Sequence, residues 1–153
     1  MRTTTIQSTS DVSPEVADLC DALFGFVRAF GLHRTEETPC GQALSVSEAQ
    51  ALTSLLETSA APSQLADRLA LARSTVSRLL DQMEGRDWIG REPNPVDGRS
   101  SVVVLTHAGR LMAERVLTAR RRRITELLAN INESDRAEVV RSLHLLAEAA
   151  HVS

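Results

Sequence analysis

Apolar residues recur at helical spacing in several stretches of the chain, and capping signals mark where these stretches begin. Ser13 and Pro14 supply an N-cap hydroxyl and a proline at the first position of a helix that extends to Gly31. The segment 45–48 reads Ser-Val-Ser-Glu, a capping box that opens a second helix ending near Ser59. The first third of the chain is therefore predicted to form two helices joined by a loop over residues 33–43.

Two further predicted helices follow closely. Pro62 begins the third helix, and residues 70–72 make the turn into the fourth. One face of the fourth helix is apolar (Val76, Leu79, Leu80, Met83) and the other is polar (Ser74, Thr75, Ser77, Arg78, Asp81, Gln82). The polar face suits a helix whose N-terminal half enters a DNA major groove about 12 Å wide, with Ser74, Thr75, Ser77 and Arg78 as the contacting residues. Taken alone, it also fits an ordinary amphipathic helix with a solvated face.

A strand pair over residues 88–92 and 101–105 is predicted next, joined by a loop that reads Asn-Pro-Val-Asp-Gly-Arg-Ser over residues 94–100. We expect Arg99 to reach the minor groove, where a guanidinium meets concentrated negative potential. Asp97 is expected to hold Arg99 or to cap the turn, Gly98 to let the tip bend, and Ser100 to complete the wing. The alternative is a surface Asp–Arg pair that contributes about 0 to 1 kcal/mol. A helix-turn-helix followed by this hairpin predicts a winged helix-turn-helix.

Two long helices are predicted to complete the chain. Thr106 caps a fifth helix that runs to about Ile131, and Ser134 opens the last one. The terminal helices carry more apolar surface than one small winged domain can cover, which predicts a two-fold dimer. The expected fold is mainly α with a small β-hairpin wing, six helices and two to three short strands. One domain spans residues 1–153, with a DNA-binding lobe at 45–109 and dimerisation helices at 13–34 and 110–153.

The charge of the chain is strongly segmented, although the net charge is −3. Residues 1–61 hold three arginines against eight acids, residues 62–123 hold twelve against seven, and residues 124–153 hold two against five. A basic centre between acidic ends is typical of a DNA-facing module, and Arg68 and Arg73 are expected to contact the DNA backbone.

Four consecutive arginines, Arg120 to Arg123, sweep roughly 300° of a helix circumference and cannot all face solvent. At least one is expected to lean on a partner chain, an acid or a cleft beside the lobe. A solvated run with one internal ion pair is the alternative.

Several classes of function are disfavoured by what the sequence lacks. The cysteines and histidines show no metal-ligand spacing, so no metal or other cofactor is expected. No histidine pairs with a carboxylate or cysteine at a catalytic spacing, which argues against an enzyme. The longest aliphatic run covers residues 102–105, and residues 1–10 are polar rather than signal-like, so a cytoplasmic protein without a membrane partner is expected.

The chain resembles MarR-type transcriptional regulators in four segments: Leu65-Ala66, Ser74 to Arg78, Asp97 to Ser100, and Leu105 to Arg110. This resemblance implies an obligate homodimer that binds a pseudo-palindromic operator in double-stranded DNA, usually as a repressor released by a small phenolic or other amphipathic effector. Two departures from the family pattern stand out. Ala70 and Ala72 replace the usual Gly and capping Ser or Thr, at a cost of roughly 1 kcal/mol of capping and one phosphate contact. Asp87 replaces the usual glycine after the recognition helix, and the fold should survive because Asp tolerates the left-handed conformation of that position better than most residues.

Two alternative functions remain open at this point. Residues 19–23 resemble the first-helix cysteine segment of organic-hydroperoxide-sensing relatives, which makes Cys20 a candidate redox residue in a peroxide-sensing repressor. The chain has no tyrosine to support a thiolate, and a buried packing cysteine is the competing interpretation. Whether Cys40 is redox-active is left open. The other alternative is a winged-helix module that binds protein rather than DNA, because the ends of the chain are acidic and the recognition helix lacks a cap.

Overall fold

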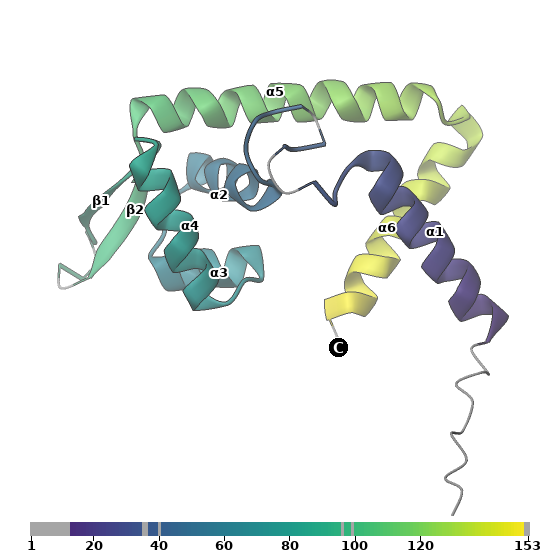
Figure 1. Ribbon diagram of the computed structural model, residues 1–153, viewed down its shortest axis with the longest axis horizontal. Helices are drawn as coiled ribbons and strands as arrows, with labels where there is room; N and C mark the ends of the chain where they lie inside the picture. The colour runs from purple at the N-terminus through teal and green to yellow at the C-terminus, as the bar shows by residue number, and fades with distance from the viewer. Residues whose placement is uncertain (1–12, 35–36, 40, 96, 99, 152–153) are drawn as a thin grey trace, which may run out of the picture.

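The computed structural model describes residues 13–34, 37–39, 41–95, 97–98 and 100–151, and within them the chain forms six helices and one antiparallel hairpin (Figure 1). The elements in chain order are α1 (Pro14–Phe30), α2 (Val46–Glu57), α3 (Pro62–Leu69), α4 (Arg73–Gly85), β1 (Ile89–Pro93), β2 (Ser101–Leu105), α5 (His107–Ala129) and α6 (Glu133–His151). This mainly helical architecture with a small hairpin confirms the predicted fold class.

The predicted helix starts are confirmed at three positions. Ser13 caps α1 through its side chain, and Thr106 Oγ1 accepts a hydrogen bond of 3.0 Å from the Gly109 amide at the start of α5. The capping box of α2 is complete, since Ser45 Oγ accepts from the Glu48 amide and Glu48 Oε2 accepts from the Ser45 amide at 2.7 Å. The last helix begins at Glu133, one residue before the predicted Ser134, because the Asn132 carbonyl already accepts from the Asp135 amide.

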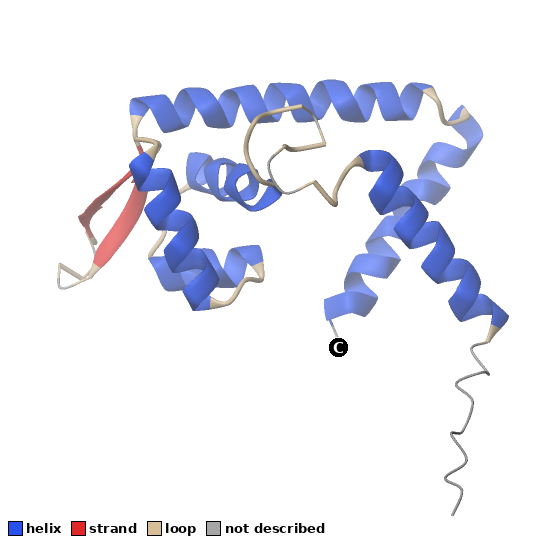
Figure 2. Ribbon diagram, in the orientation of Figure 1, coloured by secondary structure: helices blue, strands red, loops and turns tan. Residues whose placement is uncertain are grey.

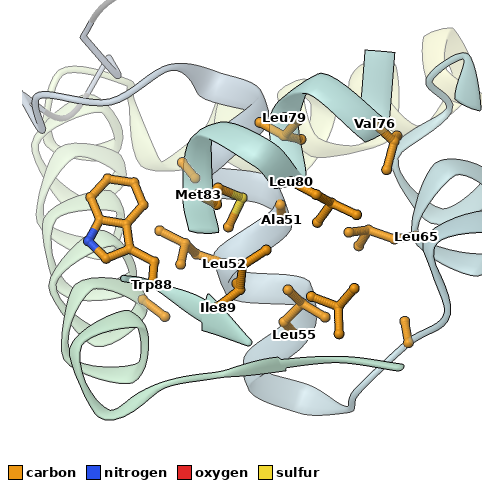
Figure 3. Packing of buried hydrophobic residues seen from close by; sticks show 14 of the residues in the cluster. Ala51, Leu52, Leu55, Leu65, Val76, Leu79, Leu80, Met83, Trp88 and Ile89 are labelled. Atoms are coloured by element: carbon orange, nitrogen blue, oxygen red, sulfur yellow. The ribbon is translucent and has the colours of Figure 1, made fainter. Parts of the chain in front are cut away.

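A single hydrophobic core holds α2, α3, α4 and the hairpin against the first half of α5 (Figure 3). The largest fully buried side chains come from all of these elements and from the loop before α2: Leu44, Leu52, Leu65, Val76, Leu80, Met83, Val103 and Val116. Burial of one such side chain stabilises a fold by about 1.5 to 3 kcal/mol. The apolar face predicted for the fourth helix is therefore the face that anchors α4 in the lobe.

The hairpin pairs β1 with β2 in antiparallel register from Ile89 opposite Leu105 to Pro93 opposite Ser101. The first strand begins one residue later than predicted because Trp88 lies in the turn after α4, where its amide donates to the Met83 carbonyl. Ala60 adds one isolated antiparallel bridge to Val103. Two strands and this bridge account for the predicted two to three short strands.

Helix α5 runs along one side of the molecule, from the hairpin to the end where α1 and α6 lie (Figure 2). Helix α1 buries none of its side chains, and α6 is exposed along nearly its whole length. No helix among the described residues is both long enough and apolar enough to span a bilayer.

Candidate nucleic-acid interface

The turn between α3 and α4 is built without a side-chain cap. Ala70 adopts the left-handed conformation with φ 51° and ψ 41°, and the Leu71 amide returns to the Ala66 carbonyl at 3.0 Å. Ala72 is the N-cap of α4, and no side chain bonds to the first-turn amides of that helix. The expected departure from the family pattern is thus present in the structure, and α4 begins with uncapped amides.

Helix α4 presents its polar residues along two different rows. Ser74, Thr75 and Arg78 are exposed on the side opposite the buried apolar face. Arg73 and Ser77 are exposed as well, but they line a hollow between α4 and the hairpin. The predicted major-groove set is therefore divided, with Ser77 at the edge nearest the wing.

Backbone hydrogen bonds close the wing loop from both sides. The Asn94 amide donates to the Ser100 carbonyl at 2.9 Å, and the Ser100 amide donates to the Asp97 carbonyl at 3.0 Å. The Asp97 carbonyl therefore helps to close the turn, and the role expected of its carboxylate stays a prediction. Gly98 does not have a positive φ, and a Cβ there would meet nothing within 4 Å, so neither conformation nor close approach requires glycine at this position. That Gly98 lets the tip bend stays a prediction. Arg99 lies outside the described residues.

The two arginines expected at the DNA backbone occupy different sides of the lobe. Arg73 is the first residue of α4. Arg68 donates from Nη1 to the Thr58 carbonyl at 3.4 Å and lines a shallow hollow between α2, α3 and α5. Arg73 thus lies beside Ser77 in the structure, whereas Arg68 is hydrogen-bonded to the end of α2.

The exit of α4 is held by a cluster that the sequence did not reveal. Arg86 Nη1 lies 3.4 Å from Oε1 of the buried Glu48, and the guanidinium carbon of Arg86 lies 4.8 Å from the Trp88 ring centroid. Asp87 has φ 57°, which confirms the left-handed conformation expected there. Its carbonyl accepts a hydrogen bond of 2.6 Å from Thr106 Oγ1. Glu48 was recognisable only as part of a capping box, because its partner is 38 positions away in the sequence.

Arg91, on β1, is a second residue of this region that was not predicted from the sequence. Its Nε donates to Glu84 Oε1 at 2.7 Å, which links the hairpin to the last turn of α4. The two-residue period of a strand places Arg91 on the same side of β1 as the buried Ile89. That period was the available signal that Arg91 faces α4 rather than open solvent.

A separate cavity of about 240 Å³ lies between the end of α1, α2 and α5. Its lining is mostly apolar, including Phe30, Val46, Ala49 and Ile124, and Arg120 and Arg123 supply the charge. The Arg123 guanidinium carbon lies 5.6 Å from the Phe30 ring centroid, and its buried Nε has no hydrogen-bond partner among the described residues.

The four consecutive arginines of α5 contact different partners. Arg122 Nε and Arg123 Nη1 lie 3.8 and 3.7 Å from the Glu126 carboxylate. Arg120 and Arg123 reach the cavity, whereas Arg121 is exposed. The expectation that at least one of the four leans on an acid or a cleft is confirmed.

The remaining candidate chemistry is limited in the part of the chain that the structure describes. Cys20 is exposed on α1, so the prediction of a buried packing cysteine is wrong for the single chain. Cys40 lies outside the described residues. The described residues contain no group of three or more His, Cys, Asp or Glu side chains placed to hold a metal ion.

Comparisons with known proteins agree with this geometry. The model of the MarR family matches residues 44–101, which cover α2 to the start of β2. An HTH-type transcriptional regulator from Mycobacterium tuberculosis is 30% identical over 100 residues, which cover 65% of this chain and 69% of that relative. The matched family consists of transcriptional regulators rather than enzymes.

Solved structures show the same fold. A mutant MarR from Escherichia coli, complexed with operator DNA, has a TM-score of 0.70 at 22% identity and covers 90% of this chain and 99% of that chain. The PcaV transcriptional regulator from Streptomyces coelicolor, in complex with its natural ligand, has a TM-score of 0.68 at 21% identity and covers 94% and 99%. On the strength of the matched family model and the 30% identical relative, this chain belongs to the MarR family of DNA-binding, winged helix-turn-helix transcriptional regulators.

Proposed function

We propose that the chain is a homodimeric repressor that a small effector releases from its operator. The observation that carries this proposal is the position of the cavity beside α1. The cavity shares α2 and α5 with the core of the DNA-binding lobe, since Val46 and Ala49 line it from α2 and Val116 lines it from α5. A ligand that moves these helices apart would also move the lobe, which is the coupling that release from DNA requires.

The dimer is supported by the uncovered apolar surface of the terminal helices. Large apolar side chains on α1 and α6 are between about a third and two thirds exposed, including Phe24 at 57% and Leu145 at 60%. Contiguous apolar surface of this kind on a folded chain usually marks an interface. Because the same helices are uncovered in every copy, a second copy with two-fold symmetry is the partner that we expect.

The proposed DNA contacts divide between the two grooves. Ser74, Thr75 and Arg78 read the major groove from the exposed side of α4, Ser77 contributes from the wing edge, and Arg99 enters the minor groove. Two lobes of one dimer contact half-sites about 10 base pairs apart, with pseudo-palindromic symmetry. Footprinting on the promoter region of the protein's own gene tests this arrangement.

The footprint should be lost or severely weakened in Arg99→Ala and in Arg78→Ala. Arg34→Ala removes an exposed arginine after the end of α1 that pairs with Glu37, outside the lobe and the terminal helices, and serves as the matched control. An unchanged footprint in both lobe variants would contradict the assignment of the grooves. Repression itself is tested by a reporter driven from the same promoter, which should rise when the protein is removed and fall if the protein activates.

The effector class is proposed from the chemistry of the cavity lining. Apolar walls with two guanidinium groups at one side suit a small amphipathic anion with an aromatic ring, such as a phenolic carboxylate. The buried Nε of Arg123, which no described residue satisfies, is a donor that such a ligand would satisfy.

A direct test uses 4-hydroxybenzoate as the probe and fluorescence anisotropy of labelled promoter DNA as the readout. The probe is expected to release DNA from the wild type, and Arg123→Ala should keep its DNA affinity while losing the response. Arg121→Ala, an exposed neighbour on the same helix, should respond as the wild type does. If neither 4-hydroxybenzoate nor other small aromatic carboxylates change the anisotropy, this effector class is wrong.

A further inference from the structure

Three segments of the lobe meet around a small hollow on the hairpin side of α4, which we call the wing-side hollow. Its lining comes from the start of α3, one row of α4 and the middle of β1: Pro62, Ser63, Arg73, Ser77, Leu80 and Arg91. On α4, Arg73, Ser77 and Leu80 are spaced by four and three residues, so they share one side of the helix. Glu84, four residues further along, continues the same row.

The charge in the wing-side hollow is positive. Two guanidinium groups line it, none of its lining residues is acidic, and Arg73 forms no ion pair within the described residues. Arg91 Nε donates to Glu84 Oε1 at 2.7 Å, which fixes one edge of that guanidinium. The opposite edge keeps donors that no described acceptor satisfies, and such a fork matches the oxygens of a phosphate.

The start of α3 adds donors of the same kind. Pro62 occupies the first helical position, and the N-cap Ala61 provides no side-chain hydrogen bond. The Ser63 amide is therefore one of the first-turn groups that the helix itself leaves unsatisfied. It lies at the positive end of the helix dipole and beside the two arginines, so it strengthens the preference for an anion without being its main source.

We propose that the wing-side hollow binds one phosphate of the DNA backbone through Arg91 and Arg73, and that Glu84 is a positioning residue that holds the Arg91 guanidinium between the recognition helix and the wing. This contact compensates for the phosphate contact that a hydroxyl at Ala72 would have supplied. The proposed phosphate contact depends on DNA binding by the lobe and is independent of any effector. It also explains why a carboxylate stands on the recognition helix close to DNA, where charge alone would disfavour it.

The test measures anisotropy of a labelled promoter duplex and of a random-sequence duplex over a range of KCl concentrations. Arg91→Ala should weaken binding to both duplexes by the same factor, about tenfold. The slope of log affinity against log salt should fall by about one for each lobe that contacts DNA. Arg91→Lys should keep that slope, because it keeps the charge. Arg34→Ala removes another exposed, ion-paired arginine outside the lobe and should match the wild type.

Glu84→Gln separates positioning from simple electrostatics. A carboxylate that only repels DNA would give tighter binding when neutralised, whereas loss of a positioning residue gives weaker binding with a retained salt slope. Thermal melting of each variant verifies that it is folded. Wild-type affinity and slope in a folded Arg91→Ala would overturn the phosphate contact, and tighter binding by Glu84→Gln would overturn the positioning role.

Two further outcomes are distinguishable. Free inorganic phosphate tested against KCl at equal ionic strength should not release DNA from the wild type. Specific release that Arg91→Ala abolishes would mean that the hollow is a site for a soluble anion instead. If the wild type fails to prefer the promoter duplex, the repressor proposal fails, while the random-sequence duplex still tests the phosphate contact.

Discussion

Replacement of Gly109 by alanine should be among the most damaging single-methyl changes that the lobe can suffer. Gly109 lies in the first turn of α5, and its amide is bonded to Thr106 Oγ1. A Cβ at this position would overlap the Trp88 carbonyl oxygen and lie 2.7 Å from the carbonyl carbon and 3.1 Å from the Trp88 Cα. The carbonyl oxygen also accepts the Thr106 amide at 3.0 Å, so the obstructing atoms are backbone that no rotamer change can remove.

The expected loss of stability in Gly109→Ala can be estimated from the backbone that must shift to admit the new methyl group. Relief of the overlap separates the start of α5 from the exit of α4, which strains the buried Trp88 and the two hydrogen bonds that join Thr106 to residues 87 and 88. Overpacking of a core costs about 1 to 3 kcal/mol and more where the backbone is involved, so we expect a loss of about 3 kcal/mol or greater. For a chain of this size, that loss lowers Tm by about 6 to 12 °C.

Urea denaturation monitored by circular dichroism measures this loss, at one fixed protein concentration because a dimer's apparent stability depends on it. Gly85→Ala is the matched control, since Gly85 is also helical and a Cβ there meets nothing within 4 Å. It should stabilise the protein by up to about 1 kcal/mol through the helix propensity of alanine. Equal changes in the free energy of unfolding for Gly109→Ala and Gly85→Ala would refute the argument that the Trp88 backbone leaves no room for a Cβ at position 109.

Three further predictions concern the joints of the lobe. Ala72→Ser supplies the missing N-cap of α4 and should raise the free energy of unfolding by about 0.5 to 2 kcal/mol in urea titrations, with Ala72→Val as a control that gains nothing. Asp87→Gly should preserve or slightly raise Tm in calorimetry, because glycine readily adopts the φ of 57° found there. Asp87→Val should lower the free energy of unfolding by at least about 1 kcal/mol. Similar Tm values for the two variants would contradict the argument from backbone strain. Glu48→Ala removes the α2 capping box and the buried partner of Arg86, and should lower the free energy of unfolding by about 1 to 3 kcal/mol. Glu114→Ala, which removes an exposed acid of α5, is the control and should lower it by less.

The features that were predictable from the sequence are those set by local interactions. Caps at Ser13, Ser45 and Thr106 lie within three residues of the groups that they bond, so their spacing alone identified three helix starts. The buried face of α4 followed from helical period, and the left-handed conformation at Asp87 followed from the resemblance, because a glycine usually stands at that position in the family.

The features that escaped prediction depend on how distant segments meet. Neither the Glu48–Arg86 pair nor the need for glycine at 109 can be read from neighbouring residues, because the partners lie on other elements. The same reason separates Arg68 from Arg73: both are basic and close in sequence, but the turn at Ala70 directs one toward α2 and the other toward the hairpin. Charge and composition identified the basic third of the chain, whereas the direction of each arginine required the tertiary structure.

The length of α5 gives the molecule a mechanical property. An uninterrupted helix of 23 residues is about 34 Å long, and it connects the hairpin end of the lobe with the end where α1 and α6 lie. If that distal end is fixed, a tilt of about 6° displaces the lobe end by about 3.5 Å, which is close to the 3.4 Å rise of one nucleotide along a DNA strand. An angular change of this size at the distal end of α5 would therefore shift the lobe end by about one base-pair step relative to bound DNA.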